Sequence, residues 1–569
     1  MAWLSRQAPE QDSSYQAVPK RVRLRVSRFM AERSTLGILL AMFAYSQSLT
    51  PSLLPREWFA QGVVSGLSIA AAYLLGTSIA HAAAALELTS DRVVARLARF
   101  RIWMGWIGLA SLPLLLLWSV RDRQAEWSAL GYDVGDRFLY SGVLLVVVLI
   151  VAVSGVLAWA SHWLYRRFLW GTSKVLPALV AGVTAATLTA TAIFMAVNEF
   201  AYSRFLNGLN DTVASQDVEV DESDPGPDPS RFKTAGATSN VSWESLGREG
   251  RRFILRSPTR ADIARFSGRE AREPVRVFIG RHSAGGVHER AELAMVELER
   301  TGGFQRDVLL MVTPTGTGWV NEQIVQPVEY FHDGNTATVA VQYSHLPSPM
   351  AFLAEREAAV ESSRAVFAAI LARLASIEPD QRPALLVAGE SLGSFGAQAV
   401  FANLDDMIRR VDGALWVGPP PMAHLRREAE ARRDSGSYQI RPVISSLPEV
   451  IFGARATDFV GTGGRYGFLQ QADDPIVWWD TSLLYSRPDW LREPLDPQVS
   501  TRLRWRPVTT YLQLTADMIV GNNFAEGLGH RYGTMPLTAW YEMLDPPGWT
   551  REMADSLRQH LDELAGSLR

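Results

Sequence analysis

The stretch PALLVAGESLGSFGAQAVFANL, residues 383–404, decides the fold prediction, because it joins an apolar run to a small-residue helix through a glycine-flanked serine. Its central residues, Gly389 to Gly393, fit the pattern G-x-S-x-G. In that pattern the serine occupies a sharp strand-to-helix turn, and the flanking glycines remove side-chain clashes. We therefore expect a strand over 383–390, Ser391 at the turn and a helix over 392–404. An ordinary glycine–serine turn is the alternative interpretation.

Apolar runs and helical stretches alternate on both sides of this segment. Further strands are expected at 275–280, 307–315, 336–343, 413–420 and 465–471. Apolar residues recur at helical spacing over 290–302 and 352–377. Continuous apolar runs between helices are typical of parallel strands that are buried on both faces. The sequence thus predicts an α/β domain over 246–569, with a mostly parallel sheet flanked by helices.

The first third of the chain has a different character. Five apolar stretches are long enough to cross a bilayer, at about 35–55, 59–85, 103–120, 138–160 and 175–200. The first is the weakest, since it contains Gln47 and is broken by Pro51 and Pro55. Four further spans follow it, which favours a retained span over a cleaved signal peptide. We predict a basic arm over 1–34, an α-helical transmembrane bundle over 35–205 and a polar linker over 206–245.

The distribution of basic residues predicts the orientation. Fourteen arginines and lysines lie on the N-terminal arm and in the loops after the second and fourth spans. The opposite loops carry four, namely Arg56, Arg121, Arg123 and Arg137. Because positive loops stay in the cytoplasm, we expect a cytoplasmic N-terminus and an extracytoplasmic C-terminal domain. The chain contains three lysines against many arginines, which indicates a bacterial coding bias and hence a bacterial cell membrane.

Composition excludes several classes of protein. The net charge of −3 gives no basic field for nucleic acid. The chain has no cysteine, so disulfides, thiol catalysis and Cys-ligated metals are excluded. The histidines form no H-E-x-x-H cluster, and no phosphate-binding loop pattern is present. We therefore expect no metal and no cofactor. The expected partners are the lipid bilayer and a small-molecule or lipid acyl substrate, and the sequence names no protein partner.

A serine hydroxyl becomes a good nucleophile only beside a base that a carboxylate orients. His530, in the glycine-rich loop GLGHRYG, is the preferred base, while His560 lies in a terminal helical pattern. Asp474 is the preferred acid, because Asp-Pro favours a turn directly after the 465–471 strand. Asp473 is a close alternative, and Asp458 is a third candidate if that strand is misplaced.

Backbone N–H groups that stabilise a developing oxyanion are expected from two places. One is Leu392, at the start of the helix after the serine. The other is the loop TPTGTGW, residues 313–319, where Thr315 and Gly316 are the candidates.

A resemblance to a known family rests on several features taken together. These are the apolar spans and the motifs TPTGTGW, GESLGSFG (389–396), DPIVWW (474–479) and GHRY (529–532). The chain resembles the bacterial membrane-bound α/β-hydrolases whose N-terminal region is a transmembrane domain, from about residue 35 to its C-terminus. The resemblance implies an α/β-hydrolase fold and serine hydrolase chemistry at Ser391, Asp474 and His530. It does not name the scissile bond.

The sequence therefore favours a membrane-anchored serine hydrolase, esterase or lipase-like, that cleaves acyl esters through an acyl-enzyme. An acyltransferase that uses the same residues on a lipid or envelope acceptor is one alternative. A non-catalytic membrane scaffold or transport component is another. Four tryptophans after the serine turn either line an acyl pocket or belong to the core: Trp416, Trp478, Trp479 and Trp490.

Overall fold

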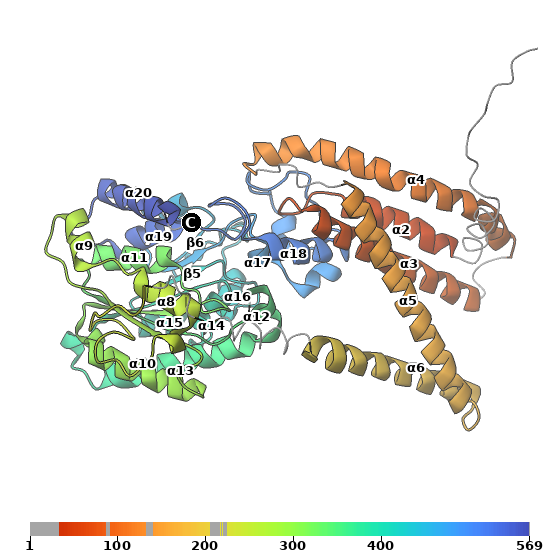
Figure 1. Cartoon of the computed structure of the whole chain (residues 1–569). Coiled ribbons are helices and arrows are strands. Elements are labelled where there is room, and N and C mark those ends of the chain that lie inside the picture. The colour runs from red at the N-terminus through yellow and green to blue at the C-terminus, as the bar shows by residue number, and fades with distance from the viewer. Residues whose placement is uncertain are drawn as a thin grey trace, which may run out of the picture.

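The computed structural model describes residues 34–86, 91–132, 140–204, 217, 219, 225–346 and 348–567 of the chain. Figure 1 shows two parts, a group of long helices at the N-terminal end and an α/β domain that follows it. We call them the helical region (α2 to α6) and the α/β domain (residues 228–567). The expected basic arm lies outside the described residues up to residue 33.

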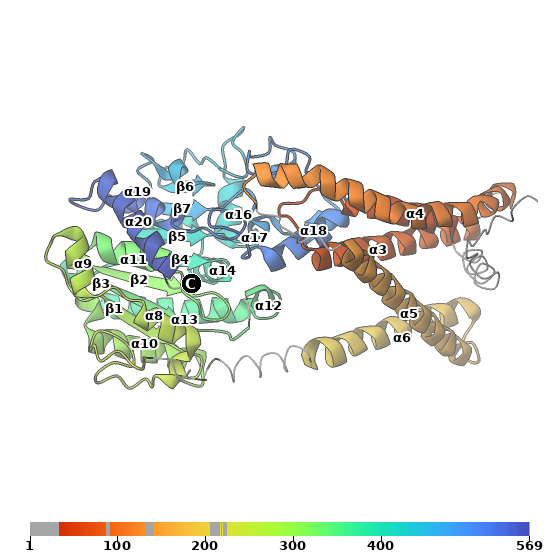
Figure 2. The ribbon, with the colours of Figure 1, turned by 45° about the horizontal axis from the view of Figure 1, so that its top comes forward.

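A wholly parallel sheet forms the centre of the α/β domain. Within the described residues it has seven strands, in the order β1-β3-β2-β4-β5-β7-β6, which can be followed in Figure 2. The strands are β1 (Val275–Ile279), β2 (Val308–Thr313), β3 (Thr336–Val341), β4 (Ala384–Glu390), β5 (Gly413–Val417), β6 (Val450–Gly453) and β7 (Tyr466–Leu469). Each expected strand is present, and the α/β fold prediction is confirmed. The four-residue β6 was not predicted, because so short an apolar run has no distinct periodicity.

The serine turn follows the central strand β4, which lies between β2 and β5. Gly389 pairs with Thr313 of β2, and Glu390 pairs with Val417 of β5. Because all strands are parallel, the loops after β2, β4, β5 and β7 leave the sheet at the same edge. In open α/β sheets this edge is where ligands bind.

Helices cover both faces of the sheet and enclose an apolar core. On one side lie α10 (Val287–Thr301), α13 (Arg356–Ala375) and α14 (Leu392–Gln398), and on the other α8 (Gly247–Leu255), α11 (Glu322–Phe331) and α19 (Met535–Leu544). The helix α20 (Arg551–Ser567) packs on α19. The described part of the domain also contains the α-helices α9 (Arg260–Ser267), α12 (Ser348–Ala354), α15 (Leu404–Arg410), α16 (His424–Ala431), α17 (Pro475–Trp478) and α18 (Thr509–Val520).

The helical region contains a helix at each place where the sequence predicts a span. These are α2 (Thr35–Ser48), α3 (Trp58–Ala85), α4 (Asp91–Ala129), α5 (Tyr140–Thr172) and α6 (Ala178–Met195). Three stretches are long and apolar enough to cross a membrane: Trp58–Ala83, Ser141–Thr172 and Ala178–Glu199. Only about 21 Å long at 14 residues, α2 is too short for a ~30 Å hydrocarbon core.

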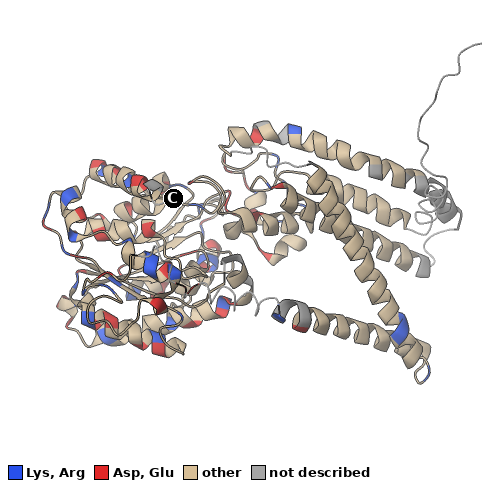
Figure 3. Ribbon diagram, viewed as in Figure 1, with Lys and Arg blue, Asp and Glu red and all other residues tan. Residues whose placement is uncertain are grey.

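The surface of the helical region fits a lipid environment. Large apolar side chains of α5 point outward, among them Leu145, Val148, Leu157 and Trp159. Figure 3 shows that Lys, Arg, Asp and Glu cover the α/β domain and are rare on α3, α5 and α6. Three candidate spans with such a surface indicate that the protein associates with a membrane.

The two parts share one apolar core. Leu53 and Leu54, between α2 and α3, pack with Trp127 and Tyr132 at the end of α4 and with side chains of the α/β domain. From α18, the buried Asp517 carboxylate accepts the backbone N–H groups of Leu53 (3.2 Å) and Leu54 (3.3 Å). It also lies 3.6 Å from the buried guanidinium of Arg56. Arg56 is therefore part of this junction and does not act as a free loop charge.

The predicted linker is partly a component of the α/β domain. Val241 and Trp243 lie in its apolar core. Phe232 and Thr234 exchange backbone hydrogen bonds with Arg276 of β1, at 3.1 Å each. The rest of the predicted linker, 206–224 except Asp217 and Glu219, lies outside the described residues. The sequence did not predict this packing, because the segment contains few apolar residues. A few buried side chains and backbone hydrogen bonds are enough to attach it to the domain.

We predict that Asp517→Ala weakens the junction strongly. The change leaves the Arg56 charge buried without its carboxylate, so the free energy of unfolding should fall by about 3–5 kcal/mol. Thermal and denaturant unfolding in detergent, followed by tryptophan fluorescence, measures this. The control is Asp489→Ala, which removes exposed ion pairs with Arg433 and Arg492 and should change stability by no more than about 1 kcal/mol. Equal effects of the two variants would contradict the prediction.

Candidate functional site

Ser391 stands at a strained turn between β4 and α14. Its φ of 56° and ψ of −123° are unusual for a residue with a side chain. Such a backbone costs on the order of 1–3 kcal/mol, and strain of this kind gathers at functional sites. The turn is held by a 2.9 Å hydrogen bond from the Ser391 N–H to the Val417 carbonyl, which anchors the serine to β5.

The two glycines of the motif are required by close backbone contacts. A Cβ at Gly389 would lie 2.6 Å from the backbone of Gly393. A Cβ at Gly393 would lie 2.2 Å from the carbonyl oxygen of Thr313, at the end of β2. The start of α14 can therefore approach the sheet only with glycine at both positions. This geometry matches the strand-to-helix turn expected for the G-x-S-x-G pattern.

Asp474 and His530 form a buried pair at the same edge of the sheet. The Asp474 Oδ2 lies 2.7 Å from the His530 Nδ1. Asp474 caps α17, where its Oδ1 accepts the Ile476 N–H at 2.9 Å. The Tyr532 hydroxyl donates to the Asp474 Oδ2 at 2.7 Å and accepts the Gln471 N–H at 3.2 Å. These contacts hold the carboxylate in place. Asp474 binds the Nδ1 of His530 and not its Nε2.

The other two candidate acids lie elsewhere. The Asp473 Oδ2 accepts the backbone N–H of Gly529 at 2.9 Å and the hydroxyl of Tyr132. Asp458 closes the turn after β6, where it accepts the N–H groups of Ala454 (2.8 Å) and Arg455 (2.9 Å). Of the three candidates, Asp474 is the one in hydrogen-bond contact with the imidazole of His530.

The expected oxyanion groups have different surroundings. Leu392 is the first residue of α14, where backbone N–H groups have no partner inside the helix. The N–H of Thr315 donates to the carbonyl of Trp319 at 2.9 Å, so its hydroxyl is the donor left to face a substrate. Thr315 lines the pocket beside Ser391, whereas Gly316 lies in the same turn outside the pocket lining.

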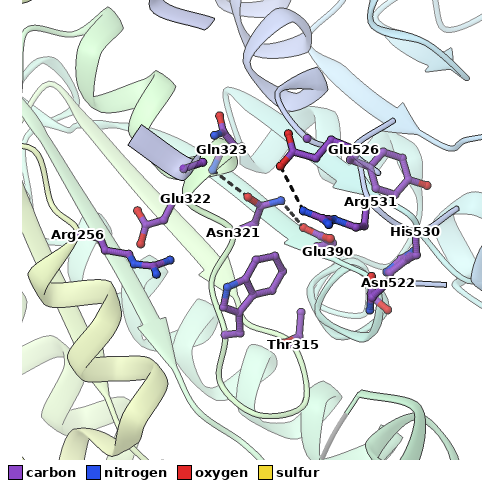
Figure 4. Close-up of a pocket in the computed structure, with 15 residues that line it drawn as sticks. Arg256, Thr315, Asn321, Glu322, Gln323, Glu390, Asn522, Glu526, His530 and Arg531 are labelled. Atoms are coloured by element: carbon purple, nitrogen blue, oxygen red, sulfur yellow. Dashed lines mark hydrogen bonds and ion pairs between the residues drawn. The ribbon is translucent and has the colours of Figure 1, made fainter. Parts of the chain in front are cut away.

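Ser391 and His530 line one cavity of about 410 Å³. Much of its wall is polar or charged, as Figure 4 shows, and includes Arg256, Asn321, Glu322, Asn522, Glu526 and Arg531. Trp319 adds an aromatic side chain to the wall. The four tryptophans considered for an acyl pocket are instead buried in the core: Trp416, Trp478, Trp479 and Trp490.

A buried carboxyl group, Glu390, and a half-buried one, Glu322, shape the charge of this cavity. Glu390 precedes the serine and accepts a 2.6 Å hydrogen bond from the amide of Asn321. Burial raises the pKa of Glu390, although the charge of His530 opposes the effect. Burial also raises the pKa of Glu322 to about 7, and the charge of the neighbouring Arg276 opposes it. The Glu322 carboxyl is therefore only partly ionised near neutral pH.

The residues of this site come from several segments, and sequence analysis missed some of them. Tyr532 lies within the quoted GHRY, and Glu390 within GESLG, but neither was given a role. Gly418, after β5, is needed because a Cβ there would lie 2.6 Å from the His530 Cε1. No local signal marks Asn321 or Tyr132, because only the tertiary fold brings them to the site.

Residues 275–557 match the alpha/beta-hydrolase family, and residues 49–258 match the N-terminus of that family. The chain belongs to this alpha/beta-hydrolase family. No curated protein and no solved structure matches the chain. The family suggests a hydrolase, and the fold and the N-terminal region agree with the sequence-based resemblance.

The arrangement in this member of the alpha/beta-hydrolase family can activate a hydroxyl group. A neutral His530 that donates from Nδ1 to Asp474 has Nε2 available to accept a proton. Burial lowers the pKa of His530, but the charge and hydrogen bond of Asp474 outweigh it and the charge of Glu390 adds to them, so the pKa is raised. No group of three or more metal-ligating side chains is found among the described residues.

We predict that Ser391 reacts with a fluorophosphonate in a pH-dependent way. Protonated His530 cannot accept the serine proton, so the rate should be low in acid and rise through a midpoint above the ordinary histidine value of about 6.5. Glu390→Gln removes a negative charge that raises the pKa of His530, so its midpoint should fall. The rate of covalent labelling, measured from pH 5 to about 9, gives both midpoints.

Glu526→Gln is the control for this profile. Glu526 also lines the cavity, but its carboxylate pairs with Arg531 at 3.2 Å. Its midpoint should match that of the wild type. A flat profile, or equal shifts in the two variants, would contradict the assignment of His530 as the base.

Proposed function

We propose that the protein is a membrane-anchored serine hydrolase that cleaves carboxylic esters, with Ser391 as nucleophile, His530 as general base and acid, and Asp474 as the acid that orients it. One observation carries the proposal. The strained Ser391 shares a cavity with His530, and the Nδ1 of His530 is bound by the buried Asp474. Family membership supports the same class of reaction.

The proposed reaction has two halves. The Ser391 oxygen attacks the ester carbonyl while its proton passes to the His530 Nε2, and the tetrahedral intermediate expels the alcohol, which takes that proton. Water, deprotonated by His530, then attacks the acyl-enzyme and releases the acid and free serine. The N–H of Leu392 and the hydroxyl of Thr315 are the proposed donors to the oxyanion. Asp474 stays ionised throughout and stabilises the imidazolium.

The cavity wall favours a polar ester over a long-chain lipid. Buried or half-buried amide, carboxyl and guanidinium groups next to Ser391 would lose hydration against an alkyl chain without gaining hydrogen bonds. A short acyl group on a hydroxyl-rich alcohol would satisfy them. We therefore propose such esters as the substrate class, and a hydroxylated acceptor in acyl transfer as the second candidate function.

The orientation of the protein is also a proposal. Segments 49–57 and the end of α4 meet the α/β domain, whereas the α5–α6 turn points away from it (Figures 1 and 2). The far side carries Arg166, Arg167 and Lys174 around that turn. By the positive-inside rule we propose that this turn is cytoplasmic and that the α/β domain lies outside the cytoplasm.

We predict graded losses of esterase activity on p-nitrophenyl acetate. Ser391→Ala and His530→Ala should abolish the reaction, and Asp474→Asn should lower kcat by about 10³–10⁴-fold through the wrong histidine tautomer. Asp473→Asn keeps an acceptor oxygen for Gly529 and should stay within about tenfold of wild type. Equal losses in the two aspartate variants would contradict the assignment of Asp474. A folded wild type without activity on any ester would favour the scaffold alternative.

Substrate choice is predicted from the polar wall. Acetate esters of glycerol or sugars should be cleaved with kcat/KM at least about tenfold above that for p-nitrophenyl palmitate. Mass spectrometry of the products, with a polyol present, separates release to water from transfer to the alcohol. A preference for the palmitate ester would contradict the proposed substrate class and favour a lipase.

The absence of cysteine makes orientation directly measurable. We predict that Glu552→Cys, on the exposed face of α20, reacts with a membrane-impermeant maleimide in intact cells. Ser173→Cys, in the exposed α5–α6 turn, should react only after the membrane is permeabilised. The reverse pattern would place the α/β domain in the cytoplasm. The wild-type chain, which has no thiol, provides the blank.

A further inference from the structure

The loop that carries His530 is held on one side by the helical region. Its backbone turns through Gly527 and Gly529, which have φ values of 85° and 62°. The His530 N–H donates to the carbonyl of Gly521 at 2.9 Å, and the Gly529 N–H donates to the Asp473 Oδ2 at 2.9 Å. The position of the imidazole therefore depends on these two backbone anchors.

Each anchor is connected to the helical region. The same Asp473 oxygen accepts a hydrogen bond from the hydroxyl of Tyr132, which follows α4. Gly521 directly follows α18, whose Asp517 binds the backbone of Leu53 and Leu54. A Cβ at Gly529 would lie 3.4 Å from the Leu54 side chain, so Leu54 packs directly on the loop.

Tyr132 is itself rigidly placed. Its ring makes edge contacts with Trp127, at 5.5 Å between centroids, and with Phe524, at 5.1 Å. Phe524 belongs to the segment that leads from α18 into the His530 loop. The ring of Tyr132 is buried, and burial raises the pKa of its hydroxyl, so it remains a hydrogen-bond donor at any physiological pH.

We propose that Tyr132 is a positioning residue for His530, and that the helical region completes the active site through Tyr132, Asp473 and Gly529. This inference rests on the proposed function only for the effect on catalysis. The effect on the loop itself holds whatever reaction the site performs. The helical region is thus a structural part of the site in addition to being a membrane anchor.

The energetics favour a role for the hydroxyl beyond packing. Burial raises the pKa of Asp473 to about 7, and the hydrogen bonds from Gly529 and Tyr132 both oppose that rise. Loss of the Tyr132 hydroxyl would leave a buried carboxylate with one donor fewer. The carboxylate would then be protonated more readily or move, and either change weakens its hold on the Gly529 N–H.

The test uses the full-length protein in detergent or nanodiscs. Tyr132→Phe keeps the ring contacts with Trp127 and Phe524 and removes only the hydroxyl. We expect kcat on p-nitrophenyl acetate to fall about tenfold or more with KM unchanged, since the loss of a hydrogen bond to a charged group misplaces the base and not the substrate. Hydrogen–deuterium exchange of peptides covering 521–533 should become several-fold faster.

Three further variants make the outcome specific. Asp473→Ala should give a loss at least as large, and the double variant should be no worse than Asp473→Ala alone, because both changes break one chain of contacts. Ser500→Ala is the matched control, because it removes a hydrogen bond between Glu126 of α4 and a loop of the α/β domain that is not part of the cavity lining. It should leave kcat and the exchange of 521–533 unchanged.

The outcomes separate this inference from the proposed function. If Tyr132→Phe has the same hydrogen–deuterium exchange and the same kcat as the wild type, the role of Tyr132 is overturned while the hydrolase proposal stays intact. Equal effects in Ser500→Ala would also overturn it, since any loosening of the junction would then suffice. If the wild type cleaves no ester, the exchange of 521–533 still decides whether Tyr132 holds the His530 loop.

Discussion

The hydrogen bond between Asp474 and His530 joins two loops that lie 56 residues apart in sequence, and both partners are buried. A buried imidazole and carboxylate are stable together only when their geometry is fixed and the remaining polar atoms are satisfied. Two hydrogen bonds satisfy the Asp474 carboxylate, one from the Tyr532 hydroxyl and one from the N-terminus of α17. The lack of a side chain at Gly418 leaves room for the imidazole. Ser391, at its strained turn, and His530 line the same cavity.

The helical region and the α/β domain are likewise joined by a shared apolar core. One apolar cluster contains Leu53 and Tyr132 from the helical region together with Trp479 and Phe524 from the α/β domain. Asp517 anchors the segment between α2 and α3 with two backbone hydrogen bonds. A membrane-associated part that packs against the His530 loop in this way is able to set the geometry of the site.

Sequence analysis predicted the fold well because its signals are local. Apolar runs located the expected strands, and each predicted span overlaps a helix, although α4 and α5 extend well beyond the predicted bounds. The grouping of Ser391, His530 and Asp474 around one edge of the sheet also followed from motif order, and their chemical roles stay predictions. The choice between Asp473 and Asp474 rested on a turn preference alone. The structure separates them by partners, since one contacts Tyr132 and Gly529 and the other contacts His530.

Other features could not be read from the chain. The polar cavity wall combines Arg256, Asn321 and Asn522, which no pattern connects. The sequence left open whether Trp478 and Trp479 line a pocket or lie in the core. An apolar residue after a strand can face either one. Residues of the predicted linker such as Trp243 lie in the apolar core of the α/β domain, although their segment contains few apolar residues.

The central claim is that one serine in this chain is activated. Native membranes containing the protein would be treated with a fluorophosphonate, and the modified site would be mapped by mass spectrometry of peptides. We predict a single adduct, on the peptide that contains Ser391, and no adduct when the labelling itself is carried out at an acidic pH that keeps His530 protonated. An adduct on another serine, or none on a folded protein at neutral pH, would contradict it.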